Sequence, residues 1–239
     1  YNLVIICTGS NSTLVKQMFG NHSLGYSYKE TSVSTIIDHK SFTNNIVRQI
    51  FFDDGILALL PISKTKSSIV WSVKKNKLNQ YKEKKNLHFK SKIKCYTKNF
   101  LKNLKFKNNI EYKDLHLLIR KKYYHGRVIL FGDALHTVHP FVGQGFNMVL
   151  RDLENLENIL KNKNNLGLDV GSSDVLSEFS NKIKSSNFLY SVGIDFIKKF
   201  FSIKEKNLTN IRNKILVKLD KGNVVKKLFF NLANKGLNL

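Results

Sequence analysis

The stretch "GRVILFGDALHTVHPFVGQGFN", residues 126 to 147, decides how this chain folds. It begins with an apolar run, continues through Gly-Asp into a polar loop that contains Pro140, and ends in Gly-Gln-Gly. A continuous apolar run is typical of a strand in a parallel sheet that is covered on both faces. In open α/β sheets, ligands bind beyond the carboxyl ends of strands, where loops lead into helices. The stretch therefore predicts a buried strand over residues 127–131, followed by a ligand-binding loop.

An amphipathic helix is predicted directly after this loop, from about Gly145 to Leu160. Its apolar face is predicted to consist of Phe146, Val149, Leu150, Leu153, Leu156 and Leu160, and its solvated face of Asp152, Glu154 and Glu157. Gly143 and Gly145 leave the amides at the helix start uncovered, which favours an anionic ligand there. Gly132 allows a ligand to approach the backbone, and Asp133 can accept hydrogen bonds from sugar-like hydroxyls.

The rest of the chain divides into a strand-rich part and a helical part. The opening "YNLVIICTGSNS" predicts a buried strand that ends in a loop. Three further segments are rich in β-branched and aromatic residues, and Asp54-Gly55 predicts a tight turn between two strands; these segments are "TSVSTIID", "IVRQIFFDDGILALLPI" and "SSIVWSVKK". Trp71 and Phe51 are expected in the packed sheet. Residues 74–109 are compatible with helix or loop, and residues 174–239 are predicted to be helical.

Composition argues against several classes of protein. The 239 residues suffice for one large or two modest domains. The net charge of +23 comes almost entirely from Lys, whereas Arg, the residue suited to phosphate and base contacts, occurs five times, so nucleic-acid binding is not favoured. Cys7 and Cys95 form no CxxC motif, which favours a reducing, cytoplasmic location. No apolar run approaches the roughly 18 residues of a spanning helix, so a soluble or peripheral protein is expected.

The sequence suggests no metal site and no side-chain nucleophile. His136 and His139 have no third ligand at a suitable spacing, so they are interpreted as structural or pocket-lining histidines. No convincing Ser-His-Asp arrangement is present, and no catalytic residue can be named.

Three segments together resemble a known family. "RVILFGDALHTVHPFVGQGFNMVLRDLENL" resembles the FAD-binding Gly-Asp motif of the flavin-dependent aromatic hydroxylases, and is most similar to the ubiquinone-biosynthesis branch. That branch carries Gly-Asp-Ala-Ala-His, then Pro and Gly-Gln-Gly-Xaa-Asn. "DDGILALLPISKTKSSIVWS" is similar to a segment of the family's substrate-facing sheet. "YNLVIICTGSNSTLVK" is similar to its Asp-Gly loop near the cofactor pyrophosphate.

The resemblance implies an α/β (α+β) fold class. It implies a Rossmann-like FAD/NAD(P)-binding domain that lacks its N-terminal βαβ unit, an inserted, mostly antiparallel substrate-domain sheet, and C-terminal helices. Residues 1–25 and 119–165 would form the FAD-binding domain, residues 26–118 the substrate-domain sheet, and residues 166–239 the helical region.

The resemblance also implies FAD as the cofactor and NAD(P)H as the electron donor. Asp133 would bind the ribityl chain, and Pro140 and residues 143–147 would border the isoalloxazine ring. The complete set of implied cofactor-binding residues is Gly9, Gly132, Asp133, Pro140, Gly143, Gln144, Gly145, Phe146 and Asn147. The implied reaction is the transfer of one oxygen atom from O₂ to an aromatic ring of a polyprenylated phenol in ubiquinone biosynthesis.

Two departures from the family pattern leave alternatives open. Nothing in the chain matches the GxGxxG motif, and Thr8 stands where the family has an acidic residue. We therefore expect the C-terminal portion of a longer hydroxylase; the alternative is a non-catalytic scaffold of the same fold in a quinone-pathway complex. Phe196, Phe200 and Phe201, with neighbouring lysines, either lie on the inner membrane surface as a peripheral contact or pack onto the FAD-binding domain.

Overall fold

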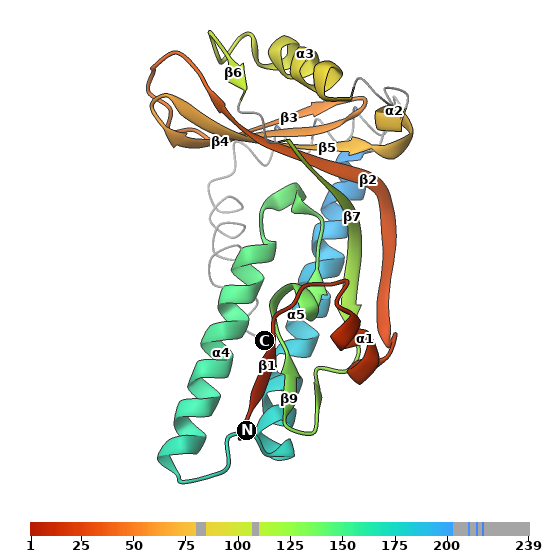
Figure 1. Ribbon diagram of the computed structural model, residues 1–239, viewed down its shortest axis with the longest axis vertical. Helices are drawn as coiled ribbons and strands as arrows, with labels where there is room; N and C mark the ends of the chain where they lie inside the picture. Colours follow the sequence, from red (N-terminus) through yellow and green to blue (C-terminus); the bar gives the residue numbers. More distant parts are fainter. Residues whose placement is uncertain (80–84, 107–109, 203–209, 211–213, 215–216, 218–239) are drawn as a thin grey trace. The chain divides into compact units, whose positions relative to one another are not determined.

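The computed structural model describes residues 1–79, 85–106 and 110–202, together with residues 210, 214 and 217 (Figure 1). The chain divides into two compact units. Unit 1 comprises Tyr1–Tyr26 and Leu117–Leu239, and unit 2 comprises Ser27–His116. Each unit has its own cluster of buried apolar side chains.

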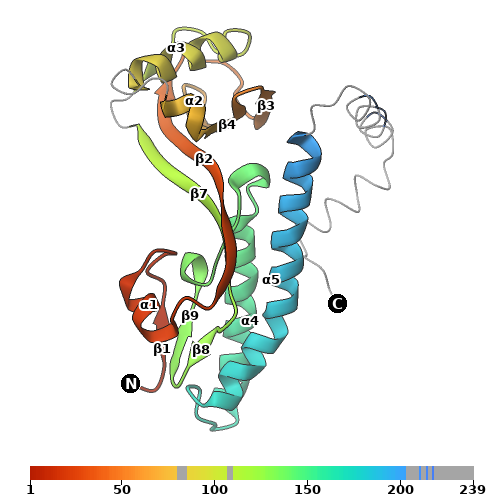
Figure 2. The same ribbon diagram turned by 90° about the vertical axis from the view of Figure 1, so that its right-hand side faces the viewer.

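The sheet of unit 1 has three strands among the described residues. Strand β1 (Val4–Ile6) pairs in parallel with β9 (Val128–Leu130), and β8 (Tyr124–His125) pairs antiparallel with β9. The strand predicted over residues 127–131 is therefore confirmed. Helix α1 (Thr13–Phe19) lies on one side of this sheet, and helices α4 (Gly145–Asn165) and α5 (Ser173–Ser202) lie on the other (Figure 2).

The prediction that the first strand is buried is only partly correct. Ile6 is buried with 4% of its surface exposed, whereas Val4 and Ile5 are 36% and 44% exposed. Because β1 is the edge strand in the order β1-β9-β8, it has a described neighbour on one side only. The apolar run predicted the strand, but the number of its neighbours determines how much of it is covered.

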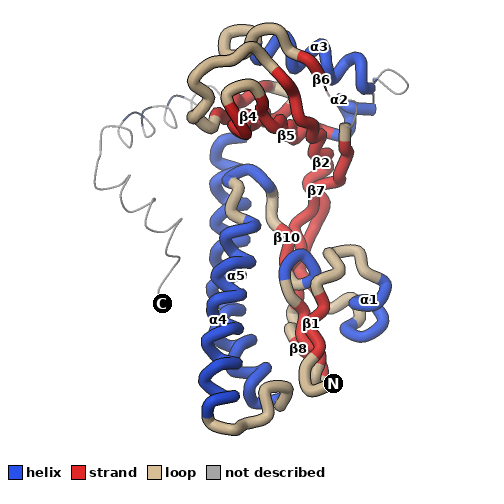
Figure 3. The backbone as a smooth tube through the Cα atoms, turned by 60° about the vertical axis from the view of Figure 1, so that its left-hand side comes forward, coloured by secondary structure: helices blue, strands red, loops and turns tan. Residues whose placement is uncertain are grey.

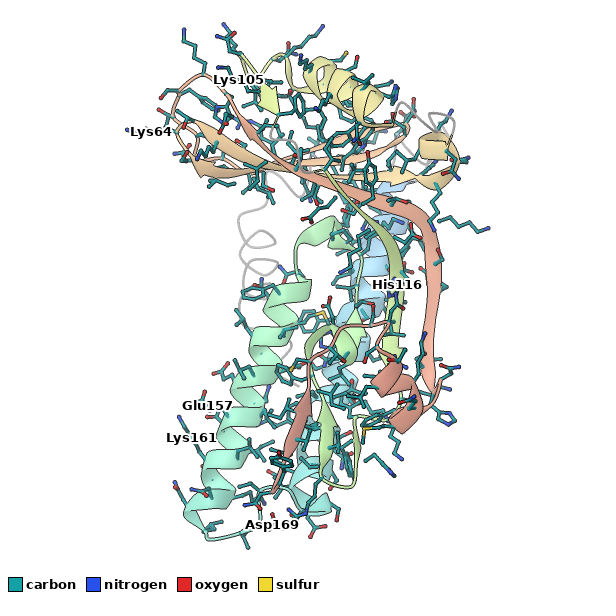
Figure 4. All side chains as sticks on the ribbon, viewed as in Figure 1. Lys64, Lys105, His116, Glu157, Lys161 and Asp169 are labelled. Atoms are coloured by element: carbon teal, nitrogen blue, oxygen red, sulfur yellow. The ribbon has the colours of Figure 1, made fainter. Side chains whose placement is uncertain are left out.

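Helix α4 forms where predicted, but its buried face is rotated from the predicted one. Its buried residues are Met148, Asp152, Leu156 and Ile159. Three of the residues predicted to be buried are instead exposed: Phe146, Leu150 and Leu153. The placement of Asp152 on the solvated face was also wrong, because this carboxylate forms hydrogen bonds in the interior. Glu157 and Lys161, an ion pair with an Nζ–Oε1 distance of 2.6 Å, lie on the outward side of the helix (Figure 4).

Helix α5 runs alongside α4 (Figure 3). One of its faces is packed and the other is exposed. Its packed face contributes Val175, Leu176, Phe179 and Ile183 to the core of unit 1. The helix predicted for residues 174–239 is confirmed from Ser173 to Ser202, and most of the remainder lies outside the described residues. Within the described part of the chain, no helix combines the length and apolar character needed to cross a bilayer.

The second sheet is largely antiparallel, with the strand order β10-β7-β2-β5-β4-β3 and with β6 paired to β2. Its strands are β2 (Ser23–Asp38), β3 (Arg48–Phe52), β4 (Gly55–Ser63), β5 (Lys66–Lys74), β6 (Lys105–Phe106), β7 (Glu111–Arg120) and β10 (His136–Thr137). In unit 2, helices α2 (Lys75–Asn79) and α3 (Lys85–Thr97) lie on one face of this sheet (Figure 1). The sequence of residues 74–109 is compatible with helix or loop; the described part of this segment contains α2 and α3, and also the short strand β6, which was not expected.

The aromatic residues of unit 2 divide between the two faces of the sheet. Trp71 is 2% exposed and stacks on Phe89 of α3, with ring centroids 5.7 Å apart, as expected for a packed residue. The expectation for Phe51 was wrong, because it is 46% exposed. Ile50 and Phe52 pack toward the core of unit 2, and side chains alternate along a strand, so Phe51 points to the opposite face.

The hairpin predicted at Asp54-Gly55 is present, with its loop one residue earlier. Phe52 pairs with Gly55, so Asp53 and Asp54 form the two-residue loop and Gly55 opens β4. Gly55 has a φ of 155°, and a Cβ atom at this position would lie 1.9 Å from the carbonyl oxygen of Ser72. The residue is therefore required by the close approach of β5, not by the turn itself.

Candidate functional site

Two loops leave the sheet of unit 1 at the same edge. Because β1 and β9 are parallel neighbours, with Ile6 opposite Leu130, their carboxyl ends lie side by side. The amide of Phe131 donates to the carbonyl of Ile6 at 3.0 Å, which holds these ends together. The loop that contains Gly9 and the 3₁₀ turn η2 (Gly132–Ala134) therefore begin next to each other, at the position where α/β sheets bind ligands.

The glycines of these loops have conformations and surroundings that suit a ligand. Gly9 and Gly132 have φ values of 84° and 61°, in the left-handed region that favours glycine. No heavy atom of the described residues lies within 4 Å of a Cβ position built on either glycine. The space beside both backbones is therefore open. Asp133, the middle residue of η2, is exposed, so its carboxylate is accessible to hydroxyl groups of a ligand.

The start of α4 presents backbone amides. Pro140 opens a second 3₁₀ turn, η3 (Pro140–Val142), and Gly143 ends it with a φ of 65°. Gln144 is the N-cap residue of α4, its side chain does not cap the helix, and its carbonyl accepts the first helical bond, from the amide of Met148 at 2.9 Å.

The amides of Gly145, Phe146 and Asn147 precede that first helical bond, so they lack helical acceptors and can donate to an anion. The side chains around them are accessible as well. Phe146 is 71% exposed, and the Asn147 amide nitrogen donates to Gln144 Oε1 at 3.2 Å. The first turn of α4 therefore offers both amide donors and an exposed aromatic ring.

Arg120 is a residue of this region that the sequence did not indicate. It is 4% exposed, and its guanidinium donates to the carbonyls of Ser10 at 3.2 Å, Ala134 at 3.4 Å and Gly20 at 3.5 Å. Burial lowers the pKa of Arg120. The guanidinium thus connects the Gly9 loop with the η2 turn. Sequence gave no signal for this role, because an arginine at the end of a strand is usually solvated.

Both histidines of the motif have defined structural partners. His139 is buried, and its Nδ1 accepts a hydrogen bond from the amide of Phe141 at 3.1 Å, which caps η3. His136 Nε2 lies 2.7 Å from Asp152 Oδ2, and Asn187 donates to both oxygens of the same carboxylate. Within the described residues, no group of three or more His, Cys, Asp or Glu side chains is arranged to hold a metal ion.

These features together fit FAD. The open glycines leave room for a bulky ligand next to the backbone, Asp133 is accessible to the hydroxyls of a ribityl chain, and the free amides of α4 suit a ring system that becomes negatively charged. Most of the candidate residues thus belong to three loops of unit 1, those after β1, after β9 and before α4.

Comparisons with known proteins support this interpretation. The profile of the family described as "FAD binding domain" matches residues 2–165. The chain is 27% identical over 227 residues to the 3-demethoxyubiquinol 3-hydroxylase of Escherichia coli, covering 94% of this chain and 57% of that protein. It is 26% identical over 255 residues to a mitochondrial ubiquinone biosynthesis monooxygenase of Rattus norvegicus, covering 88% of this chain and 51% of that protein.

Solved structures show the same fold. The p-nitrophenol 4-monooxygenase of Pseudomonas putida superposes with a TM-score of 0.73 at 18% identity, over 97% of this chain and 59% of that chain. A flavin-dependent halogenase superposes with a TM-score of 0.65 at 16% identity, over 79% of this chain and 35% of that chain. The chain spans about half the length of the curated relatives it matches. Because the family profile covers more than half of its residues, the chain belongs to the FAD binding domain family, as its resemblance to the flavin-dependent aromatic hydroxylases predicted.

Proposed function

We propose that this chain binds FAD and takes part in the hydroxylation of an aromatic ring of a polyprenylated phenol in ubiquinone biosynthesis. The observation that carries the proposal is the coincidence of the family match over residues 2–165 with the open glycine loops and uncapped helix start in unit 1. The relatives named as a 3-demethoxyubiquinol 3-hydroxylase and a ubiquinone biosynthesis monooxygenase support the choice of pathway and of O₂ as co-substrate. The choice of NAD(P)H as electron donor rests on the resemblance to the flavin-dependent aromatic hydroxylases.

Each candidate residue has a defined task in this proposal. Gly9 and Gly132 leave the backbone open to the pyrophosphate and ribityl parts of FAD, and Asp133 accepts hydrogen bonds from the ribityl hydroxyls. The amides of residues 145–147, with the positive end of the α4 dipole, stabilise negative charge on the reduced ring.

The remaining candidate residues, Pro140, Gly143 and Gln144, would border the ring and restrict its contact with water. When bound, FAD reduced by NAD(P)H supplies the activation of O₂ and the transfer of one oxygen atom to the phenol. The chain itself supplies position, electrostatics and shielding from water.

The face of the unit 2 sheet that is opposite α3 is the surface that we assign to the aromatic substrate. Phe51 pairs with Ile56, and Gln49 pairs with Ala58, which in turn pairs with Val70. These residues are exposed or half-buried, whereas Leu57, Leu59 and Trp71 on the other face are buried. An apolar surface with one amide suits a phenolic ring that carries a polyprenyl chain.

Replacement of Asp133 tests the proposal. Asp133→Ala removes the carboxylate that accepts the ribityl hydroxyls, and a hydrogen bond to a charged group contributes about 1.5–3 kcal/mol. We expect FAD affinity to fall roughly 10–100-fold, measured by titration of the apoprotein with FAD. The matched control is Glu154→Ala, which removes an exposed carboxylate from the outer side of α4 and should leave affinity unchanged. A wild-type protein that binds no FAD would contradict the proposal.

The scaffold alternative makes a different prediction in cells. A scaffold needs the fold but not the cofactor, so substitution of Gly132 and Asp133 would leave quinone levels unchanged. Loss of quinone in cells that still accumulate the variant protein at wild-type levels favours the enzyme.

We further propose that α5 makes a peripheral contact with an anionic membrane, on which a polyprenylated substrate would reside. Phe188, Leu189, Val192 and Phe196 are 44% to 68% exposed at helical spacing along one side of α5. Lys182, Lys184 and Lys199 are exposed on the same helix, and the whole chain carries a net charge of +23. By contrast, Phe201 packs against Phe141 of η3, with ring centroids 5.6 Å apart, so it is not part of this exposed surface.

Flotation with vesicles tests the membrane contact. The variant Phe188→Ser/Phe196→Ser removes two exposed rings and should lose binding to vesicles that contain anionic lipid. Leu150→Ser/Leu153→Ser, on the exposed side of α4, is the matched control and should still bind. Equal binding by both double variants would contradict the assignment to α5.

A further inference from the structure

Three polar side chains meet in the interior of unit 1. His136 Nε2 lies 2.7 Å from Asp152 Oδ2, and the Asn187 side-chain nitrogen lies 3.1 and 3.0 Å from the two Asp152 oxygens. The three residues are 2%, 2% and 3% exposed. They come from three separate elements, β10, α4 and α5.

A buried carboxylate requires an explanation, because removing a charge from water is strongly unfavourable unless partners replace the lost hydration. Here a ring nitrogen and an amide satisfy both oxygens of Asp152, so the cluster is complete. Tyr123 is also buried, and it lies near Asp152. Its burial and the negative charge of Asp152 both raise the pKa of Tyr123, which keeps its phenol neutral. Hydrophobic residues of similar size would have packed these elements with no desolvation penalty.

The location of the cluster suggests why polar groups are used. His136 follows Asp133 by three residues, and the turn between them is held by the Leu135 amide, which donates to the Gly132 carbonyl at 2.9 Å. Asp152 lies seven residues after Gly145 on α4, roughly two turns along the same rigid helix. The His136–Asp152 contact thus connects the Gly-Asp turn to the helix whose first amides face the proposed ring site.

We propose that His136, Asp152 and Asn187 are positioning residues for FAD. Their hydrogen bonds hold the η2 turn and the start of α4 in a fixed position relative to each other. This inference rests on the proposed function, since it assumes that both elements contact the same cofactor. Directional hydrogen bonds define a single geometry, whereas apolar packing tolerates small shifts of one element against another. Asn187 extends this hydrogen-bonded connection to α5, so β10, α4 and α5 are held in fixed positions relative to one another.

Isosteric substitution tests this role. Asp152→Asn keeps the size of the side chain but removes its charge and one acceptor, so the η2 turn and α4 can shift relative to each other. We expect FAD to bind about tenfold more weakly and the visible absorption bands of the bound flavin to shift. Asn187→Ala leaves the His136–Asp152 contact in place and should give a smaller change in the same direction; it serves as the second variant if Asp152→Asn does not fold.

The matched control is Ile159→Ala on the same helix. Ile159 is 3% exposed and belongs to the apolar core, so its truncation leaves a cavity without touching the polar cluster. This variant should lower the midpoint of thermal unfolding and leave FAD affinity and the flavin spectrum unchanged.

Two other results overturn the inference in distinguishable ways. If Asp152→Asn and Asn187→Ala lower the unfolding midpoint as Ile159→Ala does but leave affinity and spectrum at wild-type values, the cluster is purely structural and the proposed function stands. If the wild-type protein binds no FAD, the proposed function fails and this inference fails with it.

Discussion

At the scale of single residues, Arg120 shows how a buried charge can connect three segments of the chain. Its guanidinium donates to the carbonyls of Ser10, Gly20 and Ala134, which belong to three separate segments of unit 1. Arginine suits this position because its planar group carries five N–H donors that point in fixed directions. A lysine would present one ammonium group and could not reach all three carbonyls.

Substitution of Arg120 should destabilise unit 1. Arg120→Met keeps the apolar stem but leaves three carbonyls without these donors, and we expect the free energy of unfolding to fall by about 1–3 kcal/mol. Arg48→Met is the control, because Arg48 is half-buried over the ring of Phe100 in unit 2, and a loss of at most about 1 kcal/mol is expected. Urea unfolding measures both values. Equal losses would show that the three carbonyl contacts are unimportant.

At the scale of elements, α4 carries two adjacent apolar stripes, of which one is buried. Leu156 is 3% exposed in the core of unit 1, whereas Leu153 is 49% exposed. We expect Leu156→Ala to lower the free energy of unfolding by about 2–5 kcal/mol and Leu153→Ala by less than about 1 kcal/mol. Chemical denaturation followed by circular dichroism checks the difference. Equal losses at the two positions would instead favour the face that the sequence predicts, because that face contains both leucines.

The β3–β4 hairpin gives a second prediction at this scale. Gly55→Ala places a Cβ atom 1.9 Å from the Ser72 carbonyl, so β4 and β5 must separate locally. Gly126→Ala is the matched control in the β8–β9 turn, because its φ of 54° is strained for alanine but no described heavy atom lies within 4 Å. We expect the control to cost about 1–2 kcal/mol and Gly55→Ala to cost more, measured as the shift of the thermal midpoint. A larger effect at Gly126 would refute the steric argument.

At the scale of the whole molecule, contacts between distant parts of the chain make stability depend on pH. Asp195 of α5 accepts hydrogen bonds from the hydroxyl of Tyr26 and from Lys199, whose Nζ lies 2.9 Å away. Burial acts to raise the pKa of Asp195, but these hydrogen bonds outweigh it and hold the pKa below its ordinary value. A carboxyl group with a lowered pKa stabilises the fold above the unfolded pKa of about 3.9 and ceases to do so as the pH falls through the folded value.

Asp195→Asn tests this dependence. Above about pH 5, where the carboxyl is ionised in both folded and unfolded chains, the variant should be less stable than the wild type. The difference should shrink as the pH is lowered through the folded pKa, because protonation removes the same charge from the wild-type protein. Urea unfolding at a series of pH values measures it. A difference that stays constant from pH 7 into the acid range would show that the charge of Asp195 contributes nothing.

The sequence by itself determined two things: the local structure around the candidate site, and the family to which the chain belongs. An apolar run, Gly-Asp, a proline and Gly-Gln-Gly specify a strand, a turn and a helix start through local sterics and hydrogen bonding, and β9, η2 and α4 form in that order. The same residues carry the resemblance that the family match over residues 2–165 confirms. The roles of the nine candidate cofactor-binding residues remain predictions, and the titration of Asp133→Ala tests one of them.

Only the tertiary structure decided which side of each element is buried and which polar groups meet. Helical spacing predicted that Asp152 is exposed to solvent. The periodicity of one segment holds no information about which side chains of other segments will lie against it. The partners of Asp152 lie 16 and 35 residues away, in His136 and Asn187. The same holds for Arg120, whose carbonyl partners lie up to 110 residues away. A charge is tolerated in the interior only when such partners replace its lost hydration, and the packing of distant segments provides them.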